Sequence, residues 1–168
     1  FARVIGQREC NDIVLLSNGM LSQVLQEQDM TKQAGGIIGL AEYVKEKEIP
    51  FLYVQAPYKE DQEDALYPTG RKSYANENAD ELLGLLKEGQ VETLDLRPVL
   101  SETVDQINQY YFRTDHHWNF EGAFVGFREV VKEIATLMAY ESFKDVPTQE
   151  VEVETPLEKT TQTVVKEN

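Results

Sequence analysis

Cysteine and histidine are scarce in this chain of 168 residues, which contains one cysteine and two histidines. The single thiol, Cys10, excludes an intrachain disulfide, and no histidine lies near it in sequence to make it a nucleophile. Long apolar runs are also missing, so we predict no membrane-spanning segment and no signal peptide. The chain starts at Phe1 rather than at methionine, which is expected of a trimmed or processed product.

Basic residues are outnumbered by acidic ones. Lysine and arginine total 16, aspartate and glutamate total 30, and the formal net charge is −14. This sign excludes binding to nucleic acid and charge-driven binding to an anionic membrane surface. The acidic run at residues 60–64 is interpreted as a solvated loop. The length predicts one domain that buries a core of its own.

The order of helical and extended patterns predicts the fold class. Apolar residues recur at helical spacing over residues 31–47, and a nearly continuous apolar strand follows at 49–56. A second helix is predicted from residue 79 until Gly89, before a strand at 91–96. Alternating helices and buried strands indicate an α/β fold with three layers, α/β/α, around a mostly parallel sheet.

The two ends of the chain differ from this pattern. An Asn-Gly turn predicts an N-terminal β-hairpin with strands at residues 11–16 and 20–24. Ser17, in that turn, is interpreted as a turn residue rather than a nucleophile. Near the C-terminus the composition shifts to Glu, Thr, Val and Lys. We therefore divide the chain into an α/β domain at residues 1–142 and an acidic linker or extended arm at 143–168.

A third helix is predicted after residue 119. Its apolar positions recur three and four residues apart, which indicates an apolar face that packs on the core and holds the preceding loop. Gly122, in its first turn, permits close packing near that loop. The residues of the predicted apolar face are Phe120, Phe124, Phe127, Val131, Ile134 and Met138.

The stretch Tyr110–Asn119 concentrates the chemistry of the chain, because it holds both histidines, the only tryptophan and an aspartate. A histidine that acts as a general base needs a second group to fix its tautomer and stabilise the imidazolium. Asp115, two residues before His117, suits that role, and the other ring nitrogen of His117 is then free to accept a proton. Asn119 is predicted to cap the following helix.

Two other interpretations of this stretch stay open. In the first, the histidines are hydrogen-bonded loop residues and Trp118 is a core side chain that anchors the loop. In the second, Asp115, His116 and His117 bind a metal ion. Consecutive residues rarely converge on one ion, and the chain has no further pair of His or Cys ligands, so we expect no metal.

Tyr58 and Lys59 come directly after the strand predicted at 49–56, where open α/β sheets place their binding sites. Lys59 is therefore a candidate for contacting substrate or for orienting the loop at Asp115. The alternative is a lysine that faces solvent within an acidic loop.

Several segments together resemble one known family. The motif Phe112–Trp118 resembles the signature of the DHHW-motif family and, more widely, of the alginate O-acetyltransferase-like branch of the SGNH hydrolases. Upstream, the segments Phe51–Lys59, Leu66–Pro68 and Thr93–Leu96 resemble the family's other conserved pieces, in the same order. The resemblance runs from about residue 35 to 138, and its Asp-His-His-Trp core is the specific part.

The resemblance implies an SGNH hydrolase-like fold and acyl-transfer chemistry. Asp115 and His117 then correspond to two members of a Ser-His-Asp triad, whose serine lies well downstream in a Gly-Asp-Ser-like turn. This chain departs from the family there, because the only serine after His117 is Ser142, which has no adjacent glycine. The expected side chains that contact substrate or support the loop are Lys59, Tyr58, Arg113, His116 and Trp118.

The expected function is acyl transfer on O-acetyl groups of a cell-surface or secreted polysaccharide, with no cofactor. The resemblance also implies a membrane acyltransferase as the partner that supplies acetyl groups, and a location outside the cell or in its envelope. The alternative is an SGNH-like module without catalysis that binds a glycan or a partner protein. A small metal-dependent hydrolase is a third hypothesis.

Overall fold

The computed structural model of the chain describes residues 9–59, 66–103 and 107–138. Ser142 and the predicted arm at 143–168 lie outside the described residues. No described helix is both long and apolar enough to span a lipid bilayer. The elements in chain order are β1 (Glu9–Cys10), β2 (Ile13–Leu15), β3 (Leu21–Gln23), α1 (Thr31–Lys45), β4 (Tyr53–Gln55), α2 (Ala75–Glu88), β5 (Thr93–Asp95), α3 (Leu96–Ser101), the 3₁₀-helix η2 (Ile107–Tyr110) and α4 (Phe120–Leu137).

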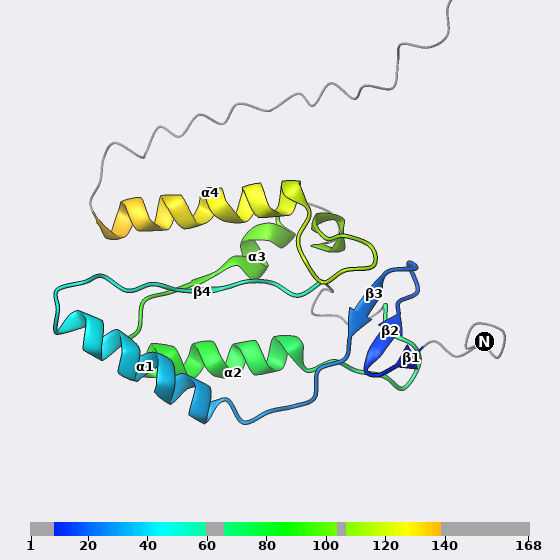
Figure 1. Ribbon diagram of the computed structural model, residues 1–168, viewed down its shortest axis with the longest axis horizontal. Coiled ribbons are helices and arrows are strands. Elements are labelled where there is room, and N and C mark those ends of the chain that lie inside the picture. Colours follow the sequence, from blue (N-terminus) through cyan, green and yellow to red (C-terminus); the bar gives the residue numbers. More distant parts are fainter. Residues whose placement is uncertain (1–8, 60–65, 104–106, 139–168) are drawn as a thin grey trace, which may run out of the picture.

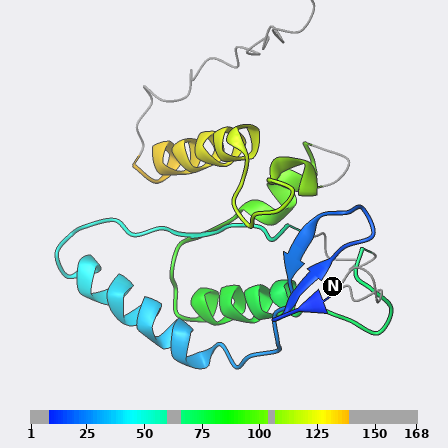
Figure 2. The ribbon, with the colours of Figure 1, turned by 45° about the vertical axis from the view of Figure 1, so that its right-hand side comes forward.

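The centre of the fold is a parallel pair of strands, β4 and β5, joined through α2. Tyr53 lies opposite Thr93, and Gln55 lies opposite Asp95. Helices α1 and α2 pack together on one side of this pair, and α3 and α4 lie on the other (Figure 1). The turned view in Figure 2 shows the same order of layers. The predicted three-layer α/β arrangement is therefore confirmed.

The central strands are shorter than the sequence predicts. The apolar run at 49–56 forms a strand only at Tyr53–Gln55, and its residues are partly buried. Ile49 is 55% exposed. The prediction of a strand buried on both faces is therefore wrong, because all three residues of β4 are only partly buried in a sheet that has two strands within the described residues.

The predicted N-terminal hairpin is confirmed. β2 and β3 pair antiparallel, with Leu15 opposite Leu21. Gly19, in the connecting turn, has a φ of +79°, a conformation that favours glycine. The Asn18 side chain accepts a hydrogen bond from the Met20 backbone N–H. β1 adds a third antiparallel strand that the sequence pattern did not indicate.

The core lies in two clusters. One joins the helices below the parallel strands, through Ala34 of α1 and Leu82 and Leu86 of α2. The other joins the hairpin, α3, η2 and the start of α4. Its fully buried side chains include Val14, Leu16, Leu96 and Leu100.

α4 begins at the predicted residue but packs through the opposite face. The buried residues of α4 are Gly122, Val125, Gly126 and Ala135. Phe120 is 89% exposed, Phe124 52% and Phe127 64%. The prediction that the apolar face of this helix is buried is therefore wrong at these three phenylalanines. Close contact is made instead through the glycines, which let the helix backbone approach η2 and the preceding loop.

Arg97, which is 6% exposed, ties the end of β5 to α2. Its Nε lies 3.0 Å from Asp95 Oδ1, and its Nη2 lies 2.6 Å from Asp80 Oδ1. Its Nη1 donates to the backbone carbonyl of Asn76. Asp95 also accepts the Arg97 backbone N–H and so caps α3.

Substitution Arg97→Met is expected to lower the free energy of unfolding by about 2–4 kcal/mol, because it leaves two carboxylates and a carbonyl without their donor. Urea denaturation measures the change. The control is Arg71→Met, which removes an exposed ion pair with Glu9 and is expected to cost less than about 1 kcal/mol. Equal losses in the two variants would contradict the structural role of Arg97.

Candidate functional site

The loop between η2 and α4 is closed at its base by backbone hydrogen bonds. The N–H of Asn119 donates to the carbonyl of Tyr110 over 2.7 Å, and the N–H of Phe112 donates to the carbonyl of His117 over 3.2 Å. Tyr111 and Trp118 face each other across an isolated antiparallel bridge. The loop therefore leaves and re-enters the fold at one point, with Asp115 and His117 in its turn.

The start of α4 is fixed to this base. The Asn119 side chain accepts the backbone N–H of Gly122 over 2.9 Å, so the predicted N-cap is confirmed. Gly122 packs against Tyr110, where an added Cβ would lie 2.6 Å from Tyr110 Cβ. Gly126 packs against the Trp118 ring in the same way. The predicted close packing at Gly122 is thus confirmed.

Substitution Gly126→Ala is expected to lower the free energy of unfolding by about 1–3 kcal/mol, because the new Cβ would lie 2.9 Å from Trp118 Cη2 and the ring must shift. Thermal or urea unfolding measures it. Gly36→Ala in α1 is the matched control: an added Cβ meets nothing within 4 Å there. That variant is expected to be more stable by roughly 0.4–1 kcal/mol. A destabilised Gly36→Ala would contradict this packing argument.

Trp118 anchors the loop through its indole nitrogen. Its Nε1–H donates to the Tyr111 hydroxyl over 2.6 Å, and the two rings meet edge to face with centroids 6.4 Å apart. The Tyr111 hydroxyl in turn donates to the carbonyl of Pro57, just after β4. This chain of contacts connects the loop to the end of the central strand.

Lys59 is buried, with 3% of its surface exposed. Its Nζ lies 2.8 Å from the carbonyl oxygen of Leu21, 3.1 Å from that of Arg113 and 2.8 Å from that of Asp115. An ammonium has three N–H donors, so these carbonyls match its donors in number. The alternative of a solvent-facing lysine is therefore wrong. Its ammonium joins β3, the end of β4 and the Asp115 loop.

Arg113 lies over the turn of the N-terminal hairpin. Its guanidinium is 3.4 Å from the carbonyl oxygen of Gly19, and its own carbonyl accepts the N–H of Leu21 over 2.9 Å. The N-terminal hairpin therefore supports the loop that carries Asp115 through these contacts with Arg113. Tyr58, which precedes Lys59 in the sequence, is 36% exposed.

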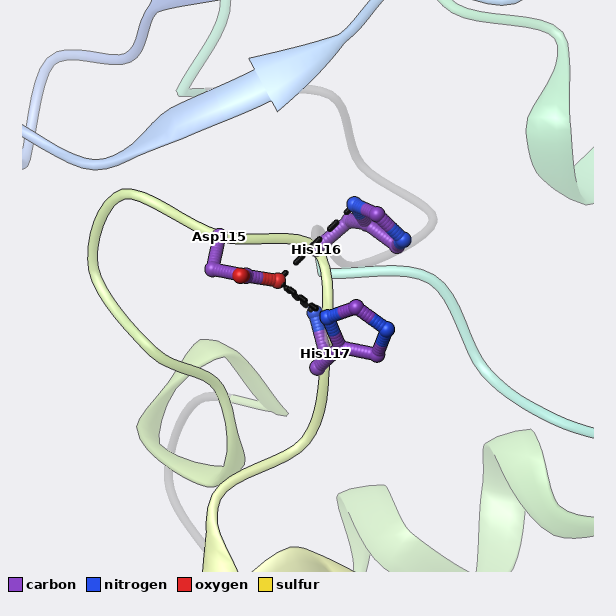
Figure 3. A group of neighbouring side chains, drawn as sticks. All are labelled: Asp115, His116 and His117. Carbon is purple, nitrogen blue, oxygen red and sulfur yellow. Dashed lines mark hydrogen bonds and ion pairs between the residues drawn. The ribbon is translucent and has the colours of Figure 1, made fainter.

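Asp115 and His117 are in direct contact (Figure 3). The Oδ1 of Asp115 lies 2.5 Å from Nδ1 of the His117 ring and 2.8 Å from the His117 backbone nitrogen. A carboxylate in this position makes Nδ1 the protonated nitrogen of a neutral imidazole, which leaves Nε2 as the basic one. Nε2 of His117 has no hydrogen-bond partner within the described residues, and the side chain is 68% exposed.

His116 lies beside the pair. Its ring stacks on that of His117 with centroids 4.2 Å apart, and its Nδ1 is 3.8 Å from Asp115 Oδ1. The three side chains bring one ligand atom each within 4.8 Å of the others, so they form a group that could hold a metal ion. All three are exposed. In most metal sites, further hydrogen bonds from surrounding residues orient the ligands.

The His117 backbone N–H, followed by the His117 side chain, lowers the pKa of the Asp115 carboxyl from its ordinary value of 3.8. A carboxyl with a lowered pKa stabilises the loop above its unfolded pKa, and this contribution is lost as the pH falls through the folded pKa. Carbon-13 NMR of Asp115 is expected to show a midpoint below 3.8. His117→Ala should keep a lowered pKa, because the backbone N–H remains. A midpoint at or above 3.8 in the original chain would contradict this geometry.

The arrangement matches what acyl transfer requires of an acid–base pair. An aspartate holds one nitrogen of an exposed imidazole, and the other nitrogen faces outward. A comparison with known protein families shows to which family the chain belongs. The family model described as the SGNH hydrolase-like domain of the acetyltransferase AlgX matches residues 11–166. The chain belongs to this family.

Solved structures agree with the family. The chain matches the structure of Bacillus cereus PatB1 with a TM-score of 0.63 and 25% sequence identity, over 74% of this chain and 43% of that chain. One structure of PatB1 with this likeness contains a sulfonyl adduct. The chain therefore has the SGNH-like α/β fold, and it spans less than half of the PatB1 chain.

A short stretch is similar to a different group of proteins. Uracil phosphoribosyltransferases of Limosilactobacillus reuteri (strain DSM 20016) and Limosilactobacillus fermentum (strain NBRC 3956 / LMG 18251) are each 67% identical to this chain over 36 residues. That stretch is 21% of this chain and 17% of each relative. The chain thus spans about a sixth of these curated relatives, and the likeness assigns it neither their fold nor their activity.

Sequence reasoning missed how Tyr111 connects Trp118 to Pro57. The Tyr111 hydroxyl and the Pro57 carbonyl belong to residues more than fifty positions apart, so no local sequence pattern predicts their contact. The carbonyl contacts of Lys59 were also not predictable in detail, although its place after a strand made it a candidate.

Proposed function

We propose that this chain supplies the acid–base pair of an enzyme that transfers or removes O-acetyl groups on a cell-surface or secreted polysaccharide. Membership of the acetyltransferase family supports acyl transfer. The contact that carries the proposal is the 2.5 Å approach of Asp115 Oδ1 to His117 Nδ1, on a loop where the imidazole is exposed.

In the proposed mechanism Asp115 fixes the tautomer of His117 and stabilises its protonated form. His117 Nε2 takes the proton of a serine hydroxyl, and the serine oxygen forms a bond to the acetyl carbonyl carbon. The ester bond of the donor breaks, and its alcohol oxygen receives the proton from His117. A sugar hydroxyl or water then attacks the acetyl-serine in the reverse sense.

The supporting residues act through the loop in this proposal. Lys59, Arg113 and Trp118 hold its backbone, so that His117 stays in place without reorganisation. His116 lies beside the pair, and Tyr58 is partly exposed next to Lys59 in the sequence; both are proposed to contact the glycan. The acetyl donor is proposed to come from a membrane acyltransferase, at a location outside the cell or in its envelope.

Acetate release from an O-acetylated polysaccharide tests the proposal. The chain joined to a segment that supplies the nucleophilic serine is expected to release acetate, and its His117→Ala variant to release it far more slowly. EDTA is expected to leave the rate unchanged, which separates this chemistry from a metal-dependent hydrolase using the Asp115 group. Equal rates of acetate release with His117 and with His117→Ala in an active fusion would contradict the proposal.

A second candidate is a glycan-binding or protein-binding module without catalysis. It is favoured by the site itself, since no serine hydroxyl within the described residues is hydrogen-bonded to His117. A glycan column that retains the chain while no acetate is released, with retention unchanged in His117→Ala, would support this module over the enzyme.

A further inference from the structure

The side chains of the acid–base pair are not held in place by burial. Those of Asp115 and His117 are 50% and 68% exposed, and they meet in the turn of the loop. The position of the imidazole therefore depends on what holds the backbone on either side of the pair. Before the turn, the carbonyl of Asp115 accepts a hydrogen bond from Lys59 Nζ over 2.8 Å. After the turn, the residue next to the imidazole is Trp118, whose indole is held by Tyr111.

The Tyr111 hydroxyl lies between two partners whose roles are fixed. The indole Nε1–H of Trp118 can only donate, so the hydroxyl oxygen accepts from it over 2.6 Å. The backbone carbonyl of Pro57 can only accept, so the hydroxyl hydrogen points to it. Tyr111 is 6% exposed and Pro57 is buried. Removing this one hydroxyl therefore leaves a donor and a buried acceptor without the group that joins them.

The two contacts that flank the pair converge on the short segment that follows β4. Lys59 holds the part of the loop before the turn, at the carbonyl of Asp115. Pro57 holds the part after the turn, through Tyr111 and then Trp118. The acid–base pair lies between these contacts, so the end of one central strand fixes both sides of the turn. Loss of either contact lets one side of the turn move relative to the other.

We propose that Tyr111 is a positioning residue, whose hydroxyl keeps the ring of His117 against Asp115 by holding the adjacent Trp118. It acts through the loop rather than on a reacting atom. Without the hydroxyl, the part of the loop after the turn loosens, and the imidazole is less often in contact with the carboxylate. The importance of this residue for catalysis rests on the proposed function. Its hold on the imidazole does not, because it depends on the contacts within the chain.

The variant Tyr111→Phe isolates the hydroxyl. It keeps the ring, and with it the edge-to-face contact with Trp118, but it removes the partner of the indole N–H and of the Pro57 carbonyl. Tyr110→Phe is the matched control. Tyr110 is 3% exposed, and its hydroxyl lies 2.7 Å from Thr103 Oγ1. The control therefore removes the hydroxyl of a neighbouring buried tyrosine that is bonded to a different partner.

Two spectroscopic signals report on the loop in each variant. Nitrogen-15 NMR of histidine-labelled protein gives the share of neutral His117 that carries its proton on Nδ1, the tautomer that the contact with Asp115 favours. Fluorescence emission reports on the surroundings of Trp118, which is the only tryptophan of the chain. Urea denaturation establishes that each variant is folded under the conditions of the two measurements.

The proposal predicts that folded Tyr111→Phe loses the preference for a proton on Nδ1 and that its tryptophan emission shifts to longer wavelength, as the indole gains contact with water. Tyr110→Phe is expected to keep both signals. An unchanged preference in folded Tyr111→Phe would overturn the proposal, because the hydroxyl would then stabilise the fold without placing the imidazole. An equal loss in Tyr110→Phe would also overturn it, since the effect would then not be specific to the hydroxyl that holds Trp118.

A second variant carries the test if Tyr111→Phe does not fold. Benzothienylalanine at position 118 keeps the shape of the indole and replaces its N–H by sulfur, so it removes only the donor to Tyr111. The proposal predicts that this variant, too, loses the preference for a proton on Nδ1 of His117. A retained preference in the folded variant would overturn the proposal.

These measurements need neither a serine nor a substrate, so they separate the two proposals. A preference that does not depend on Tyr111 overturns the positioning role and leaves the acid–base role of Asp115 and His117 untouched. A preference that depends on Tyr111, together with equal acetate release by an active fusion and its His117→Ala variant, would instead contradict the proposed function alone.

Discussion

Replacing His117 by alanine is expected to lower the rate of acetyl transfer by about 10²- to 10⁴-fold, the range that a positioned general base contributes. The loss arises because no other group takes the proton of the attacking hydroxyl at that position. His117 is 68% exposed, and its ring contacts the side chains of Asp115 and His116. The free energy of unfolding is therefore expected to change little.

Matched variants separate the acid–base role from general damage to the loop. Asp115→Asn keeps an oxygen that accepts the His117 backbone N–H, but it removes the carboxylate that fixes the imidazole. It is expected to lose activity nearly as severely as His117→Ala. His116→Ala is the control on the neighbouring exposed ring. A loss in His116→Ala as large as that in His117→Ala would assign the base to His116 instead.

Replacing Lys59 by methionine is expected to have the largest effect on both stability and activity among the supporting residues. Methionine has nearly the same length but no donor, so three backbone carbonyls lose the ammonium that joins them. We expect a loss of about 2–5 kcal/mol in the free energy of unfolding, because hydrogen bonds to a charged group are among the strong ones. Urea denaturation measures this loss.

The activity of Lys59→Met is expected to fall even under conditions where the variant is fully folded. The carbonyl of Asp115 is one of the three acceptors, so the loop that carries the pair loses a direct tie to the strand end. Lys87→Met, at an exposed position of α2, is the control and should be neutral in both assays. Unchanged activity in folded Lys59→Met would show that the loop holds its geometry without this lysine.

The sequence predicted local structure well where the signal is local. The Asn18-Gly19 turn gave the hairpin, Asn119 gave the helix cap, and Gly89 ended the second helix. Each of these depends on backbone geometry or a hydrogen bond within a few residues. The layer order followed from alternating helical and extended patterns, which depend on spacing alone.

Predictions from the sequence were wrong where the burial of a residue depends on which distant part of the chain packs against it. The spacing of the α4 phenylalanines predicted a buried face, but the described residues contain nothing that covers it. The helix instead packs through Gly122 and Gly126, whose contacts with Tyr110 and Trp118 come from chain positions that spacing does not connect. The apolar run before Pro57 also predicted a long, buried central strand. The strand that forms is short and only partly buried, in a sheet with two strands among the described residues.

At the candidate site, too, local contacts were predictable from the sequence and long-range contacts were not. The proximity of Asp115 and His117 followed from their separation of two residues in a tight loop. The burial of Lys59 did not, because its three acceptors come from β3 and from two positions in the loop. The sequence made Lys59 a candidate for contacting substrate or orienting the Asp115 loop and left a solvent-facing lysine as the alternative. The burial of Lys59 excludes that alternative.

The tautomer of His117 tests the central claim most directly, since it reports whether Asp115 orients the ring. Nitrogen-15 NMR of histidine-labelled protein resolves the two ring nitrogens of the neutral form. The geometry predicts a proton on Nδ1 and none on Nε2, with this preference lost in Asp115→Asn. A neutral His117 protonated on Nε2, or one that is unchanged by Asp115→Asn, would mean that the carboxylate does not hold the imidazole and that the proposed acid–base pair does not exist.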